Sequence, residues 1–178
     1  ARRIPYRIVD RSRLERHPLI HTFRNLLTLP DWRFTASEVL ELLTLPALAR
    51  CFEIDDAERK LLTHWIDGSG IRWGLDGEFR NELGVGDYSD YSWQFGLQRL
   101  LVGYACGSDV EEWQGVMPYL DIEGQPTQAL GKLIRLLGKL RALQRTLQMK
   151  KTVLEWLQVV RNVQSRSLGL EAGVDYRF

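Results

Sequence analysis

The stretch from residue 127 to residue 149 constrains the fold of this chain more than any other. Its leucines and its isoleucine recur every three or four positions, which is the period of one helix face, and no proline interrupts them. Basic residues fill much of the remaining helix surface: Lys132, Arg135, Lys139, Arg141 and Arg145. The pattern predicts one long amphipathic helix with a buried apolar stripe and a basic outer surface.

Shorter helices are predicted on both sides of this stretch. Pro18 suits the first position of a helix with an apolar face, and Pro30 ends that helix. Thr35 with Glu38, and Thr152 with Glu155, match the capping box that starts a helix. Capping signals and apolar spacing predict helices over residues 35–43, 47–52, 55–68, 92–107 and 152–163.

Three segments lack the helical period. Residues 4–9 alternate apolar and polar side chains, which predicts a short N-terminal strand whose pairing partner lies elsewhere in the intact protein. Residues 71–91 are rich in Gly and Asp and are expected to form a long ordered loop, and residues 165–178 a loop or a linker returning to a parent domain. The fold expected for residues 1–178 is therefore a single all-α domain, an irregular helical bundle with one short strand.

The composition is typical of a globular domain that folds without disulfide bonds. The chain has 178 residues, 44% of them hydrophobic, which is enough to bury a core. Cys51 and Cys106 show no metal-binding spacing and are expected to be buried free thiols rather than a disulfide. No apolar run is long enough to span a bilayer, so we expect a cytoplasmic protein without membrane contact.

Charge is strongly segregated along the chain, although the net charge is only +1. Residues 1–33 have a net charge of +5, residues 34–131 of −11 and residues 132–166 of +8. The basic ends can form surface patches that attract phosphates or acidic proteins. They can equally pack against the acidic middle and be neutralised by it.

Residues for catalysis or cofactor binding are sparse. His17 and His21 are four positions apart but lack the glutamate of a zinc-protease motif, and no phosphate-binding P-loop is present. The acidic pairs at 55–56 and 111–112 are interpreted as solvated helix starts, and the glycines at 68 and 70 as a helix stop. We therefore expect no cofactor, no metal, no small-molecule substrate and no enzymatic activity of the domain by itself.

Aromatic and basic residues stand out in the segments predicted to be loops. Flat side chains beside arginine can stack on nucleic-acid bases or anchor a protein interface, but tryptophans also fill gaps between helices. The residues concerned are Trp32, Arg33, Arg72, Trp73, Trp113 and Tyr119.

Four short stretches occur together in an order and spacing that resemble the RecC family, the gamma chains of bacterial exodeoxyribonuclease V. They are IPYRI at 4–8, RFTASEVL at 33–40, SGIRWGLD at 69–76 and EWQG at 112–115. The resemblance extends to Val163, and the stretch at 69–76 is its most specific part. IPYRI also resembles the segment that leads into the accessory 2B domain of UvrD-like superfamily 1 helicases.

The resemblance implies a helicase-like, non-catalytic 2B domain within a complex that also holds RecB-like and RecD-like subunits. Such a domain would support DNA unwinding and degradation in double-strand break repair and recombination, by guiding DNA and by contacting subunits. The alternative is a structural spacer that touches no nucleic acid. The residues expected to contact DNA or a partner are Arg2, Arg3, Arg7, Trp32, Arg33, Arg72, Trp73, Lys132, Arg135 and Lys139.

Overall fold

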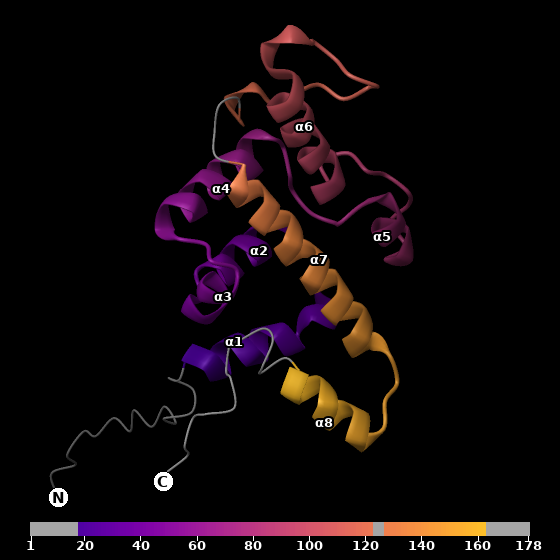
Figure 1. The fold of residues 1–178 in the computed structure, drawn as a ribbon. Coiled ribbons are helices and arrows are strands. Elements are labelled where there is room, and N and C mark those ends of the chain that lie inside the picture. Colours follow the sequence, from indigo (N-terminus) through magenta and orange to yellow (C-terminus); the bar gives the residue numbers. More distant parts are fainter. Residues whose placement is uncertain (1–17, 123–126, 163–178) are drawn as a thin grey trace, which may run out of the picture.

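The computed structural model describes residues 18–122 and 127–162, and over these residues the chain is helical without a strand. The predicted all-α class is thus confirmed, while the predicted strand at 4–9, the tail at 165–178 and Arg2, Arg3 and Arg7 lie outside the described residues. The elements (Figure 1) are α1 (Pro18–Leu27), η1 (Leu29–Asp31), α2 (Ala36–Leu43), α3 (Pro46–Cys51), α4 (Asp56–Gly68), α5 (Gly77–Glu82), α6 (Trp93–Cys106), η2 (Gly107–Asp109), η3 (Leu120–Ile122), α7 (Gln128–Gln148) and α8 (Val153–Asn162).

The predicted long helix is α7, and it runs diagonally through the molecule beside α2, α3 and α4 (Figure 1). It packs against α4 and η1, which lie far apart in the sequence. Its core-facing leucines are almost fully buried: Leu130, Leu133, Leu136, Leu137 and Leu140. Ile134, which the sequence placed in the apolar stripe, is exposed instead, because the buried stripe is turned toward Leu136.

The helix starts predicted from capping signals are confirmed. In α2 the Thr35 hydroxyl accepts from the Glu38 N–H, and the Glu38 carboxylate accepts from the Thr35 N–H at 2.7 Å. Reciprocal bonds also join Thr152 and Glu155 ahead of α8. Such boxes satisfy amides that have no partner inside the helix, so the start of each helix is fixed locally.

The segment at 71–91 is an ordered connection, as predicted, but it also contains the short helix α5. The Asp76 carboxylate accepts from the Phe79 N–H at 2.7 Å and so caps this helix. Phe79 then packs edge-on against Phe34 with ring centroids 5.5 Å apart. The Gly- and Asp-rich composition hid the helix because it depends on this long-range packing.

The core is centred on two fully buried tryptophans, Trp65 and Trp93. The indole N–H of Trp93 donates to the Phe34 carbonyl at 2.8 Å and so joins α6 to the segment before α2. Neither Cys51 nor Cys106 forms a disulfide among the described residues, as predicted, but both are half-buried rather than buried.

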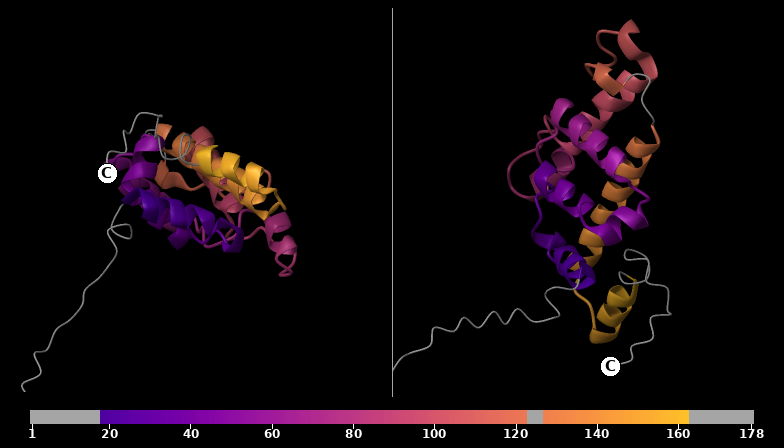
Figure 2. Two further views of the ribbon diagram at one scale, coloured as in Figure 1. Left: turned by 90° about the horizontal axis from the view of Figure 1, so that it is seen from below. Right: turned by 90° about the vertical axis from the view of Figure 1, so that its left-hand side faces the viewer.

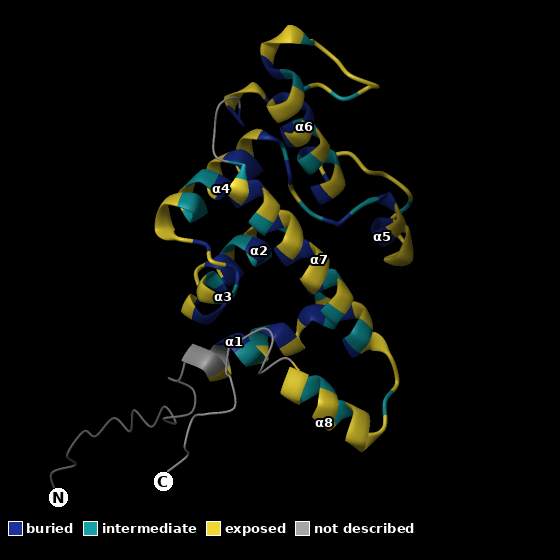
Figure 3. Cartoon of the chain, viewed as in Figure 1, coloured by how far each residue is buried: buried dark blue, intermediate teal, exposed yellow. Residues whose placement is uncertain are grey.

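The molecule is elongated, with α6 at one end and α8 at the other (Figure 2). Colouring by burial shows α8 and the connections next to α6 largely exposed (Figure 3), and α8 has no buried residue. No helix in the part of the chain that the structure describes is both long and apolar enough to cross a membrane.

Candidate nucleic-acid interface

Three of the five bases of α7 lie on the outer surface of the helix. Arg135, Lys139 and Arg145 are exposed, and no ion pair of theirs is found among the described residues. The Lys139 ammonium lies 5.2 Å from the centroid of the Phe52 ring, which fixes its stem against α3 without neutralising its charge. These three residues, here called the α7 basic row, carry positive charge that is available to a partner.

The other two bases of α7 form ion pairs with acidic residues of this chain. Lys132 donates to the Glu58 carboxylate at 2.6 Å and to the Glu53 carbonyl, and both charged side chains of this pair are largely buried. Arg141 pairs with Asp76 at 2.5 Å and approaches Glu78 at 3.8 Å. The basic helix is therefore partly neutralised by the acidic middle of the chain, while the α7 basic row is not.

Small residues accompany the α7 basic row: Gly131 precedes Arg135, and Gly138 and Ala142 lie between its members. Gly131, Gly138 and Ala142 are exposed, and a Cβ added at either glycine would meet no atom within 4 Å. At these three positions, beside the basic side chains, the helix surface thus carries no large side chain, which allows close approach of an extended partner.

The structure brings the predicted residues of two loops together. The Ala36 N–H donates to the Arg72 carbonyl at 2.8 Å and the Gly74 N–H to the Arg33 carbonyl at 2.9 Å, so the segments 33–36 and 72–74 lie side by side. Arg33 and Arg72 are both exposed, although Arg72 lies 3.3 Å from the exposed Asp67. The two tryptophans of these segments, Trp32 and Trp73, are half-buried: the Trp32 indole donates to the Thr28 hydroxyl, and Trp73 lies under the guanidinium of Arg80.

Arg80 was not singled out from the sequence, yet it organises the whole segment 73–91. Only 5% of the residue is exposed, and its guanidinium donates to the carbonyls of Trp73, Tyr88 and Asp90, each at 2.8 Å. It also lies 4.3 Å from the Trp73 ring centroid. Burial lowers the pKa of Arg80, while the nearby charge of Asp90 acts in the opposite direction. The available signal was a lone base within a strongly acidic, glycine-rich stretch.

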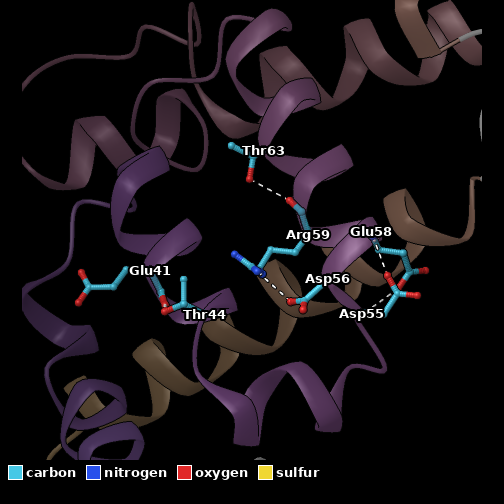
Figure 4. Close-up of polar contacts among 7 residues, drawn as sticks. All are labelled: Glu41, Thr44, Asp55, Asp56, Glu58, Arg59 and Thr63. Atoms are coloured by element: carbon cyan, nitrogen blue, oxygen red, sulfur yellow. Dashed lines mark hydrogen bonds and ion pairs between the residues drawn. The ribbon is translucent and has the colours of Figure 1, made fainter.

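The acidic residues that begin α4 serve structural roles (Figure 4). Asp55 caps the helix by accepting from the Glu58 N–H at 2.7 Å, and Asp56 pairs with Arg59 at 2.8 Å. This pairing holds the pKa of the Asp56 carboxyl below its ordinary value. Glu111 and Glu112 differ from the prediction: they lie in an exposed turn before the Trp113–Val116 bridge, not at a helix start.

Two of the singled-out aromatic residues have different environments. Trp113 is 50% exposed and does not fill a gap between helices. Tyr119 is buried, with its hydroxyl 3.2 Å from Asp121 and 3.3 Å from His64. Burial, together with Asp121, raises the pKa of the Tyr119 phenol. His17 and the side chain of His21 lie outside the described residues, and among those described no group of three potential ligands could hold a metal ion.

The sequence of the chain matches the family described as the RecBCD enzyme subunit RecC fourth domain over residues 16–171. The chain belongs to the RecC family. Its similarity to individual RecC proteins extends over most of its length. It is 40% identical over 162 residues to the RecBCD enzyme subunit RecC of Escherichia coli strain K12, and 32% identical over 157 residues to that of Haemophilus influenzae. It is also 29% identical over 161 residues to the RecC subunit of Mycobacterium tuberculosis.

These alignments cover 91%, 88% and 90% of the chain, respectively. The chain spans only 14% to 15% of the length of the RecC relatives it matches. Membership in the RecC family thus agrees with the resemblance seen in the sequence, and the match covers only one part of the length of these relatives.

Proposed function

We propose that this chain is a non-catalytic, helicase-like domain of a RecC subunit in an exodeoxyribonuclease V complex. It would act beside RecB-like and RecD-like subunits in double-strand break repair and recombination, and it would guide DNA by contacting phosphates. The observation that carries the proposal is the α7 basic row, three exposed bases without a carboxylate partner among the described residues.

The geometry of the α7 basic row suits a nucleic-acid backbone better than a compact ligand. Arg135 and Arg145 are ten positions apart, which corresponds to roughly 15 Å along a helix. The exposed glycines before and within the row, Gly131 and Gly138, leave room for a sugar–phosphate chain. Contacts of this kind carry no sequence information and weaken steeply with salt.

The paired segments at 33–36 and 72–74 offer a second contact region. Arg33 and Arg72 present guanidinium groups to solvent next to the half-buried Trp32 and Trp73. Arg33 is the stronger candidate of the two bases, because Asp67 offsets the charge of Arg72.

The test compares DNA affinity of the RecC subunit with and without the triple charge reversal Arg135→Glu, Lys139→Glu and Arg145→Glu. Affinity for single-stranded and forked DNA should fall by at least about tenfold at low salt, and the slope of log affinity against log salt should drop by about 2 to 3. The matched control reverses three exposed bases on other helices: Arg24→Glu, Arg50→Glu and Lys60→Glu. Equal effects of both triple variants, or no effect of the α7 variant, would contradict the DNA role.

A structural spacer is the second candidate function. The ion pairs from Lys132 to Glu58 and from Arg141 to Asp76 support it, because they use bases of α7 to hold the fold together. Absence of any DNA affinity at low salt, with assembly into the complex retained, would favour the spacer.

A further inference from the structure

Helix α6 has a solvent-facing side without charge. Gln94, Gln98, Leu101, Tyr104 and Ala105 lie on this side; Leu101 is 46% exposed and Tyr104 49% exposed. The single charged residue of α6 is Arg99, which turns away from this side and donates to the Ser69 and Met117 carbonyls. Solvated helix faces normally carry charged residues, whereas the centre of a protein interface is depleted of them.

Exposed apolar side chains also occur in the connections at both ends of α6. The Tyr91 and Phe95 rings pack with centroids 5.6 Å apart, and the Arg99 guanidinium lies 5.7 Å from the Phe95 ring. The Nε of Arg99 then donates to the Met117 carbonyl at 3.1 Å. Tyr91 is 58% and Met117 65% exposed, so large apolar side chains are exposed in the connections at both ends of α6. We call the uncharged side of α6, together with these two connections, the α6 surface.

The connection at 83–91 is held in place before any partner binds. Arg80 donates to the carbonyls of Tyr88 and Asp90, while the side chains of Tyr88 and Val85 are exposed. Tyrosine supplies large contact area at low entropic cost, and a preordered loop loses little freedom on binding.

Acidic residues flank the α6 surface at both ends. The exposed acidic residues at one end are Glu82, Asp87 and Asp90, and those at the other end are Asp109, Glu111 and Glu112. Residues 81–121 contain seven acids against one base, a net charge of −6. Such a rim repels DNA phosphates and complements a partner whose edge carries Arg and Lys.

The negative charge around the α6 surface favours a protein partner over DNA as the occupant. The α6 surface lies at the end of the molecule opposite α8, and α1 is likewise distant from it (Figures 1 and 2). We infer that the α6 surface is the docking site for another subunit of the complex, one that presents an apolar patch edged by arginine and lysine. The inference rests on the proposed membership in a multisubunit complex and not on DNA contact by α7.

The first experiment places the photo-cross-linking residue benzoylphenylalanine at position 101 or at position 27 of the RecC subunit and assembles the complex. Leu27 is the control because it is an exposed leucine on α1, at 39%. Irradiation should join position 101, but not position 27, to an Arg- and Lys-bearing peptide of another subunit. Cross-links from position 101 only to DNA, only within the same polypeptide, or to nothing in an intact complex would each overturn the inference.

The second experiment measures the assembly affinity of variants whose folding is checked by their unfolding midpoints. Leu101→Ser with Tyr104→Ser should weaken assembly by about tenfold or more, while Leu27→Ser should not change it. Glu112→Lys should weaken assembly at low salt and lose its effect at high salt, unlike Glu41→Lys at an exposed acid of α2.

The α6 variants should leave DNA affinity unchanged, so this inference and the DNA role of α7 can fail independently. Unaltered assembly of both the Leu101/Tyr104 and the Glu112 variants would overturn the docking site whatever the DNA measurements give.

Discussion

Arg80 shows how one buried charge can order a long stretch of chain. It reaches three backbone carbonyls on two sides of the segment 73–91, and among the described residues it makes no hydrogen bond to a carboxylate. A buried carbonyl without a donor is costly, and a guanidinium is the side chain that can serve several at once from a planar fork. Arg80 thus ties the two sides of the segment together, beside the apolar contacts of Leu75 and Phe79.

Replacing Arg80 by Met should therefore lower the free energy of unfolding by about 2 to 4 kcal/mol, because the carbonyls of Trp73, Tyr88 and Asp90 lose their donor. Urea unfolding monitored by tryptophan fluorescence measures the change. Arg80→Lys should recover little of the loss, since one ammonium cannot span both sides of the segment. The exposed Arg72→Met is the control and should lie within about 0.5 kcal/mol of the parent. A parent-like midpoint for Arg80→Met would contradict this role.

At the scale of the elements, the glycines of α7 and α6 have opposite roles. Gly131 and Gly138 face open solvent, whereas a Cβ on Gly96 would lie 2.1 Å from the Ile71 side chain. Alanine at position 131 or 138 should raise the free energy of unfolding by about 0.5 to 1 kcal/mol each, because glycine has a poor helix propensity. Gly96→Ala should lower it. Thermal unfolding of the three variants measures these changes in stability. A lower unfolding temperature for Gly138→Ala would contradict the prediction for α7.

The sequence predicted those elements whose determinants are local. The capping boxes at Thr35 and Thr152, and the cap at Asp55, each involve groups within three positions of one another, so the pattern alone located α2, α4 and α8. Helix α5 was missed although Asp76 caps it locally, because the contacts that pack it come from Phe34 and Arg141, which are distant in the sequence. The bases of α7 were recognised as a set. The sequence could not predict which of these bases form ion pairs within the protein, since Lys132 pairs with Glu58 across 74 positions.

For the molecule as a whole, the Lys132–Glu58 pair joins the acidic middle of the chain to the basic helix α7. Both side chains are largely buried, so removal of one partner leaves the other charge poorly solvated. Lys132→Met alone should lower the free energy of unfolding by about 1 to 3 kcal/mol. The double variant Lys132→Met with Glu58→Gln should lose less than the sum of the single variants, with a coupling of about 1 kcal/mol. Glutamine keeps the capping function of residue 58, and strict additivity in urea unfolding would contradict the coupling.

The packing of α7 on η1 has a consequence for how the chain is made. The Gln144 amide donates to the Leu29 carbonyl, and 115 positions separate the two residues. At a synthesis rate of about 5 to 20 residues per second, roughly 6 to 23 s pass between their appearance at the ribosome. During this interval the apolar faces of α1, α2 and α4 have no α7 to cover them. Nascent chains that stall before α7 therefore expose the core side of the bundle, which makes them substrates for chaperones and proteases.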